Sequence, residues 1–154
     1  MEDILGLEEA ARVSASRDRA ASAQAWQIRK GEILRSQIPV FFSAMGERIK
    51  TAAADFNGEL GLDGDHGISV HLSERTITIR KTQGVVFLRT ILHYFGTERV
   101  SVTTQTVRGY RQDVSTSEML FDVSSDGVVT LNEKSFFDLA KDLFRGATDC
   151  YIER

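Results

Sequence analysis

The sequence predicts an α+β fold in which helices pack on an antiparallel sheet of five or six strands. Three observations lead to this prediction. An apolar face with helical spacing runs from Phe41 to Phe56, alternating apolar and polar segments occupy residues 68–132, and a second helical face lies near the C-terminus. Because the strands and the helix each carry one apolar face, we expect the helix to cover a curved meander in a roll or helix-grip arrangement.

The first part of the chain predicts a helix with little to bury. Residues 8–35 are rich in alanine, glutamate, arginine and glutamine, which favour helices. Up to Ala25 the apolar side chains are mostly alanine, with Val13, so their burial contributes little free energy. An isolated helix is marginal in water. We therefore predict that residues 1–25 form a helical arm, either frayed or oligomerising, and that residues 26–154 form a single α+β domain.

Pro39, the only proline, interrupts the helical region. Proline cannot donate the backbone hydrogen bond that a helix interior needs, and it disfavours helix at the preceding residue. We therefore predict a kink at Pro39, or a break followed by a second helix. Asn57–Gly58 predicts the helix end, because both residues tolerate the left-handed conformation.

The middle of the chain predicts antiparallel strands. Most segments alternate in polarity, and Asp126–Gly127 is a tight-turn signal between the last two. The predicted strands are residues 68–72, 76–81, 85–95, 99–107, 118–123 and 128–132. Because most connections are short, the strands form an antiparallel meander. The exception is "TVRGYRQDVSTSE", residues 106–118, which is predicted as the longest loop between strands.

A short helix is predicted at residues 134–145, after the last strand. Ser135 and Asp138 have the spacing of a capping box at its start. Leu139 and Leu143 lie one turn apart and belong to a single apolar face. The helix thus has a face that must be buried against the rest of the domain.

Charge and cysteine content restrict the partners and the compartment. The 19 basic and 22 acidic residues give a net charge of -3, which provides no broad attraction to nucleic acid or an anionic membrane. The single cysteine, Cys150, cannot form an internal disulfide. No apolar run approaches the ~20 residues of a membrane helix, and the acidic N-terminus is not a secretory signal. We expect a cytoplasmic protein without a membrane partner.

The stretch "LGLDGDHGIS", residues 60–69, contains the candidate metal ligands. Asp63 and Asp65 have the first spacing of a calcium loop, and Glu74 occupies its twelfth position. The loop requires glycine at its sixth position, where this chain has Ile68. Glycine, aspartate and histidine between a helix end and a strand are also typical of a turn. We therefore predict a connector and no metal site.

A candidate binding surface consists of arginine and tyrosine side chains. The predicted loop 106–118 supplies three of them, and two neighbouring strands supply the others: Arg108, Tyr110, Arg111, Arg80 and Arg89. Arginine and tyrosine are enriched at binding hot spots. The alternative is an ordinary hairpin loop with solvated arginines.

The sequence contains no recognisable catalytic motif: no phosphate loop, nucleophile elbow, HExxH or CxxC. We therefore favour a non-enzymatic protein–protein interaction module without a cofactor, whose partner is a second copy or another protein. One alternative is a small-ligand binder or enzyme with an apolar pocket between the sheet and residues 40–57. The other is nucleic-acid binding through the arginine and tyrosine loop, which the net acidity disfavours.

Overall fold

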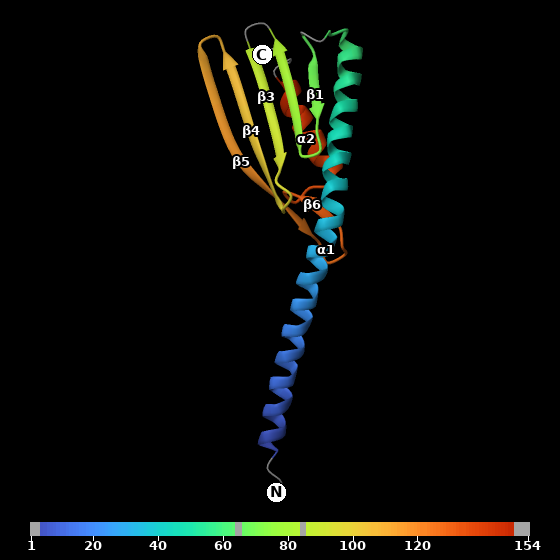
Figure 1. Ribbon diagram of the computed structural model, residues 1–154, viewed down its shortest axis with the longest axis vertical. Coiled ribbons are helices and arrows are strands. Elements are labelled where there is room, and N and C mark those ends of the chain that lie inside the picture. Colours follow the sequence, from blue (N-terminus) through green and yellow to red (C-terminus); the bar gives the residue numbers. More distant parts are fainter. Residues whose placement is uncertain (1–3, 64–65, 84–85, 150–154) are drawn as a thin grey trace.

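The computed structural model of the chain describes residues 4–63, 66–83 and 86–149. Its elements, in chain order, are α1 (Leu5–Leu60), β1 (Ile68–Leu72), β2 (Thr76–Gln83), β3 (Val86–Tyr94), β4 (Arg99–Arg108), β5 (Arg111–Val123), β6 (Val129–Leu131) and α2 (Phe136–Thr148). The six strands form one antiparallel sheet in sequence order. Figure 1 shows this sheet curling around α2 and the upper part of α1. The predicted α+β fold is confirmed.

α1 is one helix of 56 residues, with Pro39 inside it. The alternative of a second helix that begins at Pro39 is therefore wrong. Proline removes one helical hydrogen bond and costs about 3 kcal/mol in a helix interior. Ile38, Phe41 and Phe42 surround it and are buried in the core, so tertiary packing offsets that cost.

The helix ends two residues beyond the predicted Asn57–Gly58 stop. Gly61 caps it in the left-handed conformation, with φ of 63°, and its N–H points at the carbonyls of Asn57 and Gly58. A side chain is strained at this φ, which explains why glycine occupies the cap.

The core lies between α1 and the inner face of the sheet, the face that carries Ile77, Leu92 and Val100. These three side chains and Met45 and Ile49 of α1 are at most 1% exposed. Met45 and Ile49 belong to the apolar face predicted from residues 41–56. The predicted packing of this helix segment on the sheet is therefore confirmed.

α2 covers the remaining part of the core. Ser135 caps it as predicted, because its Oγ accepts a hydrogen bond from the Asp138 N–H at 3.1 Å. Phe144 meets Phe56 of α1 edge to face, with ring centroids 5.8 Å apart. The short helix is therefore fixed against α1, and the two helices share one side of the sheet.

β4 and β5 form a long hairpin where the sequence predicted a loop. Residues 106–118 are not a long connection, because Arg108 pairs directly with Arg111 across the turn Gly109–Tyr110. Gly109 has φ of 59°, which such a tight turn requires. The prediction was wrong because β5 is polar and exposed over residues 111–118, so its sequence shows no buried face.

Asn57 connects α1 to β1 with two hydrogen bonds to Ile68. Its Nδ2 donates to the Ile68 carbonyl at 2.8 Å, and its Oδ1 accepts from the Ile68 N–H at 2.9 Å. A Cβ at Gly67 would lie 2.6 Å from Asn57 Oδ1. Glycine is therefore needed there because the two segments approach closely.

Candidate functional site

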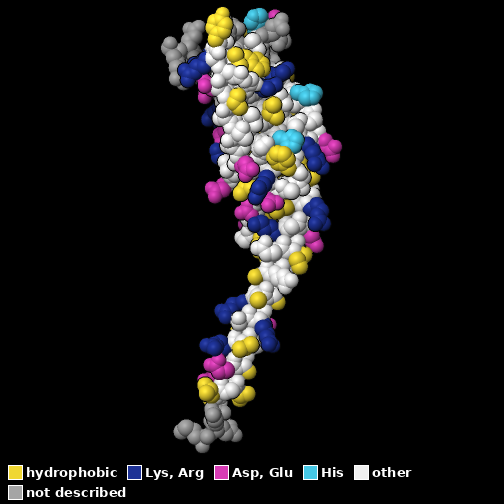
Figure 2. Space-filling view, turned by 60° about the vertical axis from the view of Figure 1, so that its left-hand side comes forward, with side chains coloured by type: hydrophobic (Ala, Val, Ile, Leu, Met, Phe, Trp, Pro, Cys, Tyr) yellow, Lys and Arg dark blue, Asp and Glu magenta, His cyan; other side chains and the backbone are white. Residues whose placement is uncertain are grey.

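The most exposed element of the molecule is the first part of α1, residues 5–25, which we call the arm. Every side chain of the arm is exposed, including Leu5 at 61%, Leu7 at 74% and Val13 at 45%. Figures 1 and 2 show it projecting from the domain as a bare helix. Because packing supplies most of the stability of a helix in a protein, an uncovered helix of this length presents an unused surface.

The side chains of the arm stripe lie along one side of this helix. The stripe extends from just before the arm to just beyond it and consists of Ile4, Ala11, Ala15, Ser22, Trp26 and Ile33. At 100° per residue these six positions fall within about 60° of one another, with Ile4 at the N-cap, and the charged Glu8 and Arg29 fall in the same sector. Ile4 is 52% exposed, whereas Trp26 and Ile33 are half-buried. The arm therefore has a narrow side of small and apolar residues, with one acidic residue near the tip and one basic residue near the base.

An apolar groove lies where the arm joins the domain, and we call it the base groove. Its volume is about 440 Å³, and its lining includes Ile33, Val40, Val128, Val129 and Phe136. Val40 is 60% exposed and Val128 is 56% exposed. Because Ile33 belongs to both, the arm stripe continues directly into the base groove.

An ion pair fixes the base of the arm to the sheet. The Nζ of Lys30 lies 2.6 Å from Oδ1 of Asp122 in β5. The hydrogen bond from Lys30 is the main reason that the pKa of Asp122 is below its usual range. Trp26, one turn before Lys30, is the only tryptophan of the chain. This contact therefore connects α1 to β5 just beyond the arm.

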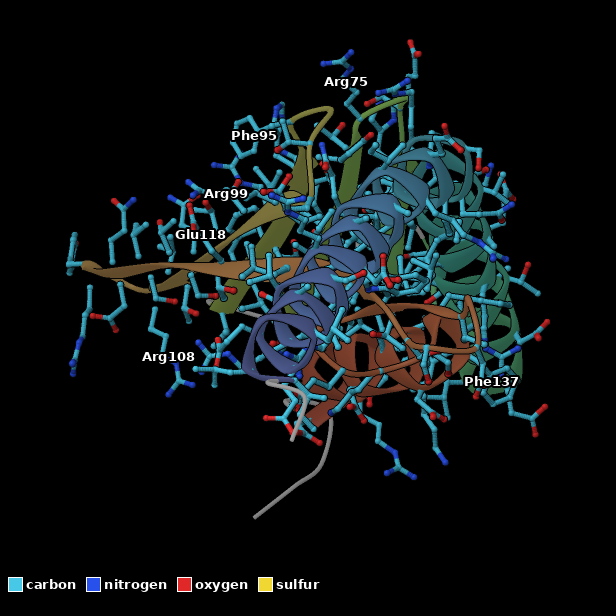
Figure 3. The ribbon with its side chains drawn as sticks, turned by 90° about the horizontal axis from the view of Figure 1, so that it is seen from below. Arg75, Phe95, Arg99, Arg108, Glu118 and Phe137 are labelled. Atoms are coloured by element: carbon cyan, nitrogen blue, oxygen red, sulfur yellow. The ribbon has the colours of Figure 1, made fainter. Side chains whose placement is uncertain are left out.

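The structure does not gather the predicted arginine surface into one place. Arg80 and Arg89 lie opposite each other on β2 and β3, on the outer face of the sheet, which is the face away from α1. Arg108 and Arg111 lie opposite each other at the β4–β5 turn. Arg108 is eight residues from buried Val100 on β4 and Arg111 is eight from buried Met119 on β5, so both lie on the inner-face side of the strands. Figure 3 shows Arg108 on the other side of the hairpin from Arg99 and Glu118.

The outer-face arginines are held by neighbouring side chains. Arg89 donates from Nη2 to Oε1 of Gln105 at 2.7 Å, and its buried Nε has no hydrogen-bond partner among the described residues. The Arg80 guanidinium lies 5.9 Å from the ring centre of Phe87. Arg89 is therefore held against the sheet, whereas Arg80 remains exposed to solvent.

The β4–β5 turn presents the other predicted residues to solvent. The Nε of Arg111 lies 3.3 Å from Oδ2 of Asp113, and both side chains are mostly exposed. Tyr110 is fully exposed. The negative charge of Asp113 reduces the positive charge that this turn offers to a nucleic acid.

Asp63 and Glu74, two of the three candidate metal ligands, lie at opposite ends of β1. Asp63 precedes the strand and Glu74 follows it, and the five-residue strand between them is about 16 Å long at 3.3 Å per residue. Asp65 lies outside the described residues. Asp63 accepts two backbone hydrogen bonds from His66 and Gly67 through its carbonyl, and its carboxylate lies 2.8 Å from His66 Nδ1. No group of three or more His, Cys, Asp or Glu suited to a metal occurs in the part of the chain that the structure describes.

The outer face of β3 is a second exposed apolar surface, which sequence reasoning missed. Phe87, Ile91 and His93 on this face are half-buried and Phe95 is 51% exposed. The rings of His93 and Phe95 lie 4.4 Å apart. The sequence did show that residues 85–95 are apolar on both faces. We interpreted this pattern as a strand in the middle of the sheet, which it is, but not as one whose outer face is left uncovered.

The centre of the predicted pocket region between the sheet and residues 40–57 is filled, because Met45 and Ile49 occupy it and are 0% exposed. At its edge, a hollow of about 400 Å³ lies between α1 and the β1–β2 hairpin and is lined by Phe42, Gly46 and Leu72, among others. Another of about 430 Å³ lies between α1 and α2. These hollows are open grooves beside α1 and not an enclosed apolar chamber.

Comparison of the chain with models of protein families, with curated proteins and with solved structures finds no match. Within residues 4–63, 66–83 and 86–149, no helix is both long enough and apolar enough to cross a bilayer. The candidate functional site therefore stands on its geometry alone, and its most distinctive part is the arm with the base groove.

Proposed function

We propose that this protein is a non-enzymatic interaction module that binds a protein partner through its helical arm. The observation that carries the proposal is the arm itself, whose side chains from Leu5 to Ala25 are all exposed. These 21 residues form a helix that packs on no other described element, so one of its sides is available to a partner. Within the arm, the stripe offers such a partner the small side chains of Ala11, Ala15 and Ser22, while Leu5, Leu7 and Val13 are exposed outside it.

The rest of the molecule supports a binding role more than a catalytic one. The predicted arginines lie on opposite faces of the sheet, and three of them contact Gln105, Phe87 or Asp113. A catalytic site requires several polar groups that converge on one reacting atom. Among the described residues the polar candidates lie apart, whereas the small and apolar residues of the arm stripe share one side of a single helix.

Photo-crosslinking in cells that produce the protein tests this proposal. A benzoylphenylalanine replaces Ala15 on the arm stripe, Val13 on the opposite side of the arm, or exposed Lys50 on the packed part of α1. We expect discrete protein adducts at position 15 that exceed those at position 50, because only the arm contacts the partner. Equal adduct levels at all three positions contradict the proposal.

A further inference from the structure

We propose that the partner of the arm is a second copy of this chain, bound antiparallel about a two-fold axis. In this pairing, a residue of one copy lies opposite the residue of the other copy for which the two numbers add up to 37, so that Ile4 of one copy faces Ile33 of the other. The inference rests on the proposed function, because it identifies the partner that the arm binds. Four features of the arm and the base groove support it.

The first feature is the set of residues that one register brings together. An interface between two identical chains about a two-fold axis must be complementary to itself. Antiparallel pairing places Ile4 opposite Ile33, Ala11 opposite Trp26, and Ala15 opposite Ser22. The helical repeat makes the spacing symmetric, and this register gives every member of the stripe a partner within the stripe.

The second feature is the distribution of side-chain size. The large members Trp26 and Ile33 lie at the base of the arm, and the small members Ala11, Ala15 and Ser22 lie between Ile4 and Trp26. In the proposed register, the largest side chain, Trp26, meets the small Ala11 of the other copy. Small residues between the ends let the two backbones approach closely, while the large residues fill the space at both ends.

The third feature is charge. The tip of the arm carries Glu8 and Glu9, whereas Arg29 and Lys30 lie at its base. Antiparallel pairing in the same register places Glu8 opposite Arg29 of the other copy, once at each end. Parallel pairing would instead place the acidic tips together and the basic residues together. Such surface pairs add little affinity, but they select the orientation.

The fourth feature is the base groove. The register brings Ile4 at the tip of one arm beside Ile33 of the other copy, at the edge of that copy's groove. Leu5 and Leu7, exposed at 61% and 74%, lie next to Ile4. The register thus brings the tip of each arm to the Ile33 edge of the other copy's groove, where Ile4 meets an apolar side chain.

The area of contact sets the expected strength. The paired region, residues 4–33, is about 45 Å long, and a strip about 10 Å wide on each helix gives roughly 900 Å² in total. This area is close to the lower limit of about 1,000 Å² for a specific interface. We therefore expect a reversible dimer with a dissociation constant in the micromolar range.

Sedimentation velocity of the full chain from about 1 to about 300 μM tests the inference, with Trp26 emission as a second measurement. We expect a monomer–dimer equilibrium, and a shift of the emission to shorter wavelength as dimer forms. Ala15→Glu places a charge in the stripe and should weaken association at least about tenfold. Val13→Glu adds the same charge on the opposite side of the arm and should change it less than about twofold. A chain that stays monomeric, or equal effects of the two variants, overturns the inference.

Charge exchange tests the register. Glu8→Arg or Arg29→Glu alone creates two like-charge contacts in the dimer and should weaken it. The double variant restores opposite charges and should recover the original dissociation constant. Failure to recover overturns the antiparallel register. Adducts at position 15 that contain only a different protein overturn the second copy as partner while leaving the proposed function standing. Absence of adducts at position 15, together with a chain that stays monomeric in sedimentation velocity, removes both.

Discussion

The two ends of α1 are formed by one continuous helix and have opposite environments. Residues 5–25 are exposed on every side, whereas the segment from Ile38 to Ala53 contains seven buried residues. Both segments have adequate helix propensity, so propensity does not explain the difference. The difference lies in side-chain size, because the packed segment carries Phe41, Phe42 and Met45 where the arm carries alanine.

This contrast shows that helix formation and domain stability are separable within one element. The packed segment is held by the sheet, and it keeps its helix even through Pro39. The arm extends a helix that is nucleated in the packed segment. Adding a residue to an existing helix costs less conformational entropy than starting a new helix. Substitutions in the two segments should therefore act on different quantities.

The largest expected effect is in the packed segment. Ile49→Ala removes a side chain that is 0% exposed and leaves a cavity against the sheet. We expect the free energy of unfolding to fall by about 2–5 kcal/mol in urea titrations. Val13→Ala in the arm is the matched control and should change the free energy by less than about 0.5 kcal/mol. Similar losses for both variants would show that the arm is packed in solution.

The second effect is a pH dependence of the free energy of unfolding. It arises at Lys81 on β2, in the sheet that the packed segment of α1 covers. Burial lowers the pKa of Lys81 on the inner face from 10.5 to about 8, although nearby Asp149 raises it. Between these values the unfolded chain binds more protons than the folded chain, so stability rises with pH.

The change between pH 8 and 10.5 should be on the order of 2 kcal/mol in urea titrations. Lys81→Met should abolish this increment and leave the helicity of the arm unchanged. An increment of the same size in the variant would assign the titration to another group.

A smaller effect is expected at the far end of the packed segment. Asn57→Ala removes both hydrogen bonds to Ile68 and leaves that backbone less satisfied. We expect a loss of about 1–2 kcal/mol and faster amide hydrogen exchange in β1. Asn57→Asp is the control that keeps the acceptor for the Ile68 N–H and should lose less. An unchanged exchange rate in β1 would mean that other contacts hold the strand.

The smallest effect is expected at the junction of the two segments. Lys30→Met removes the ion pair with Asp122, whose side chain is 64% exposed. We expect a loss of less than about 1 kcal/mol, which disappears in about 1 M salt because solvent ions screen the pair. A larger loss that persists in salt would show that Lys30 contributes through packing.

Several parts of the fold followed from local sequence. The helical spacing after Phe41 identified the face that packs on the sheet, and Ser135 with Asp138 identified the start of α2. The strand order followed from short connections, since antiparallel neighbours need few linking residues. These features depend on residues near one another in the chain, which is why the sequence reveals them.

The candidate site was harder to predict. Arg80 and Arg111 share a residue type and a region of the chain, but the strand register places them on opposite faces of the sheet. The base groove joins α1 to Val128 and Phe136, which are distant in sequence. Neither the separation of the arginines nor the groove has a local signal, because each depends on how the strands and helices come together.

The sequence by itself determined the class of the fold, the core face of α1 and the weakness of the arm's apolar surface. Those properties follow from side-chain size and periodicity, which can be read directly from the sequence. Only the tertiary structure decided that the helix continues through Pro39 and that residues 106–118 pair as strands. Both outcomes depend on contacts between distant segments, whose free energy outweighs the local preferences for a break and a loop.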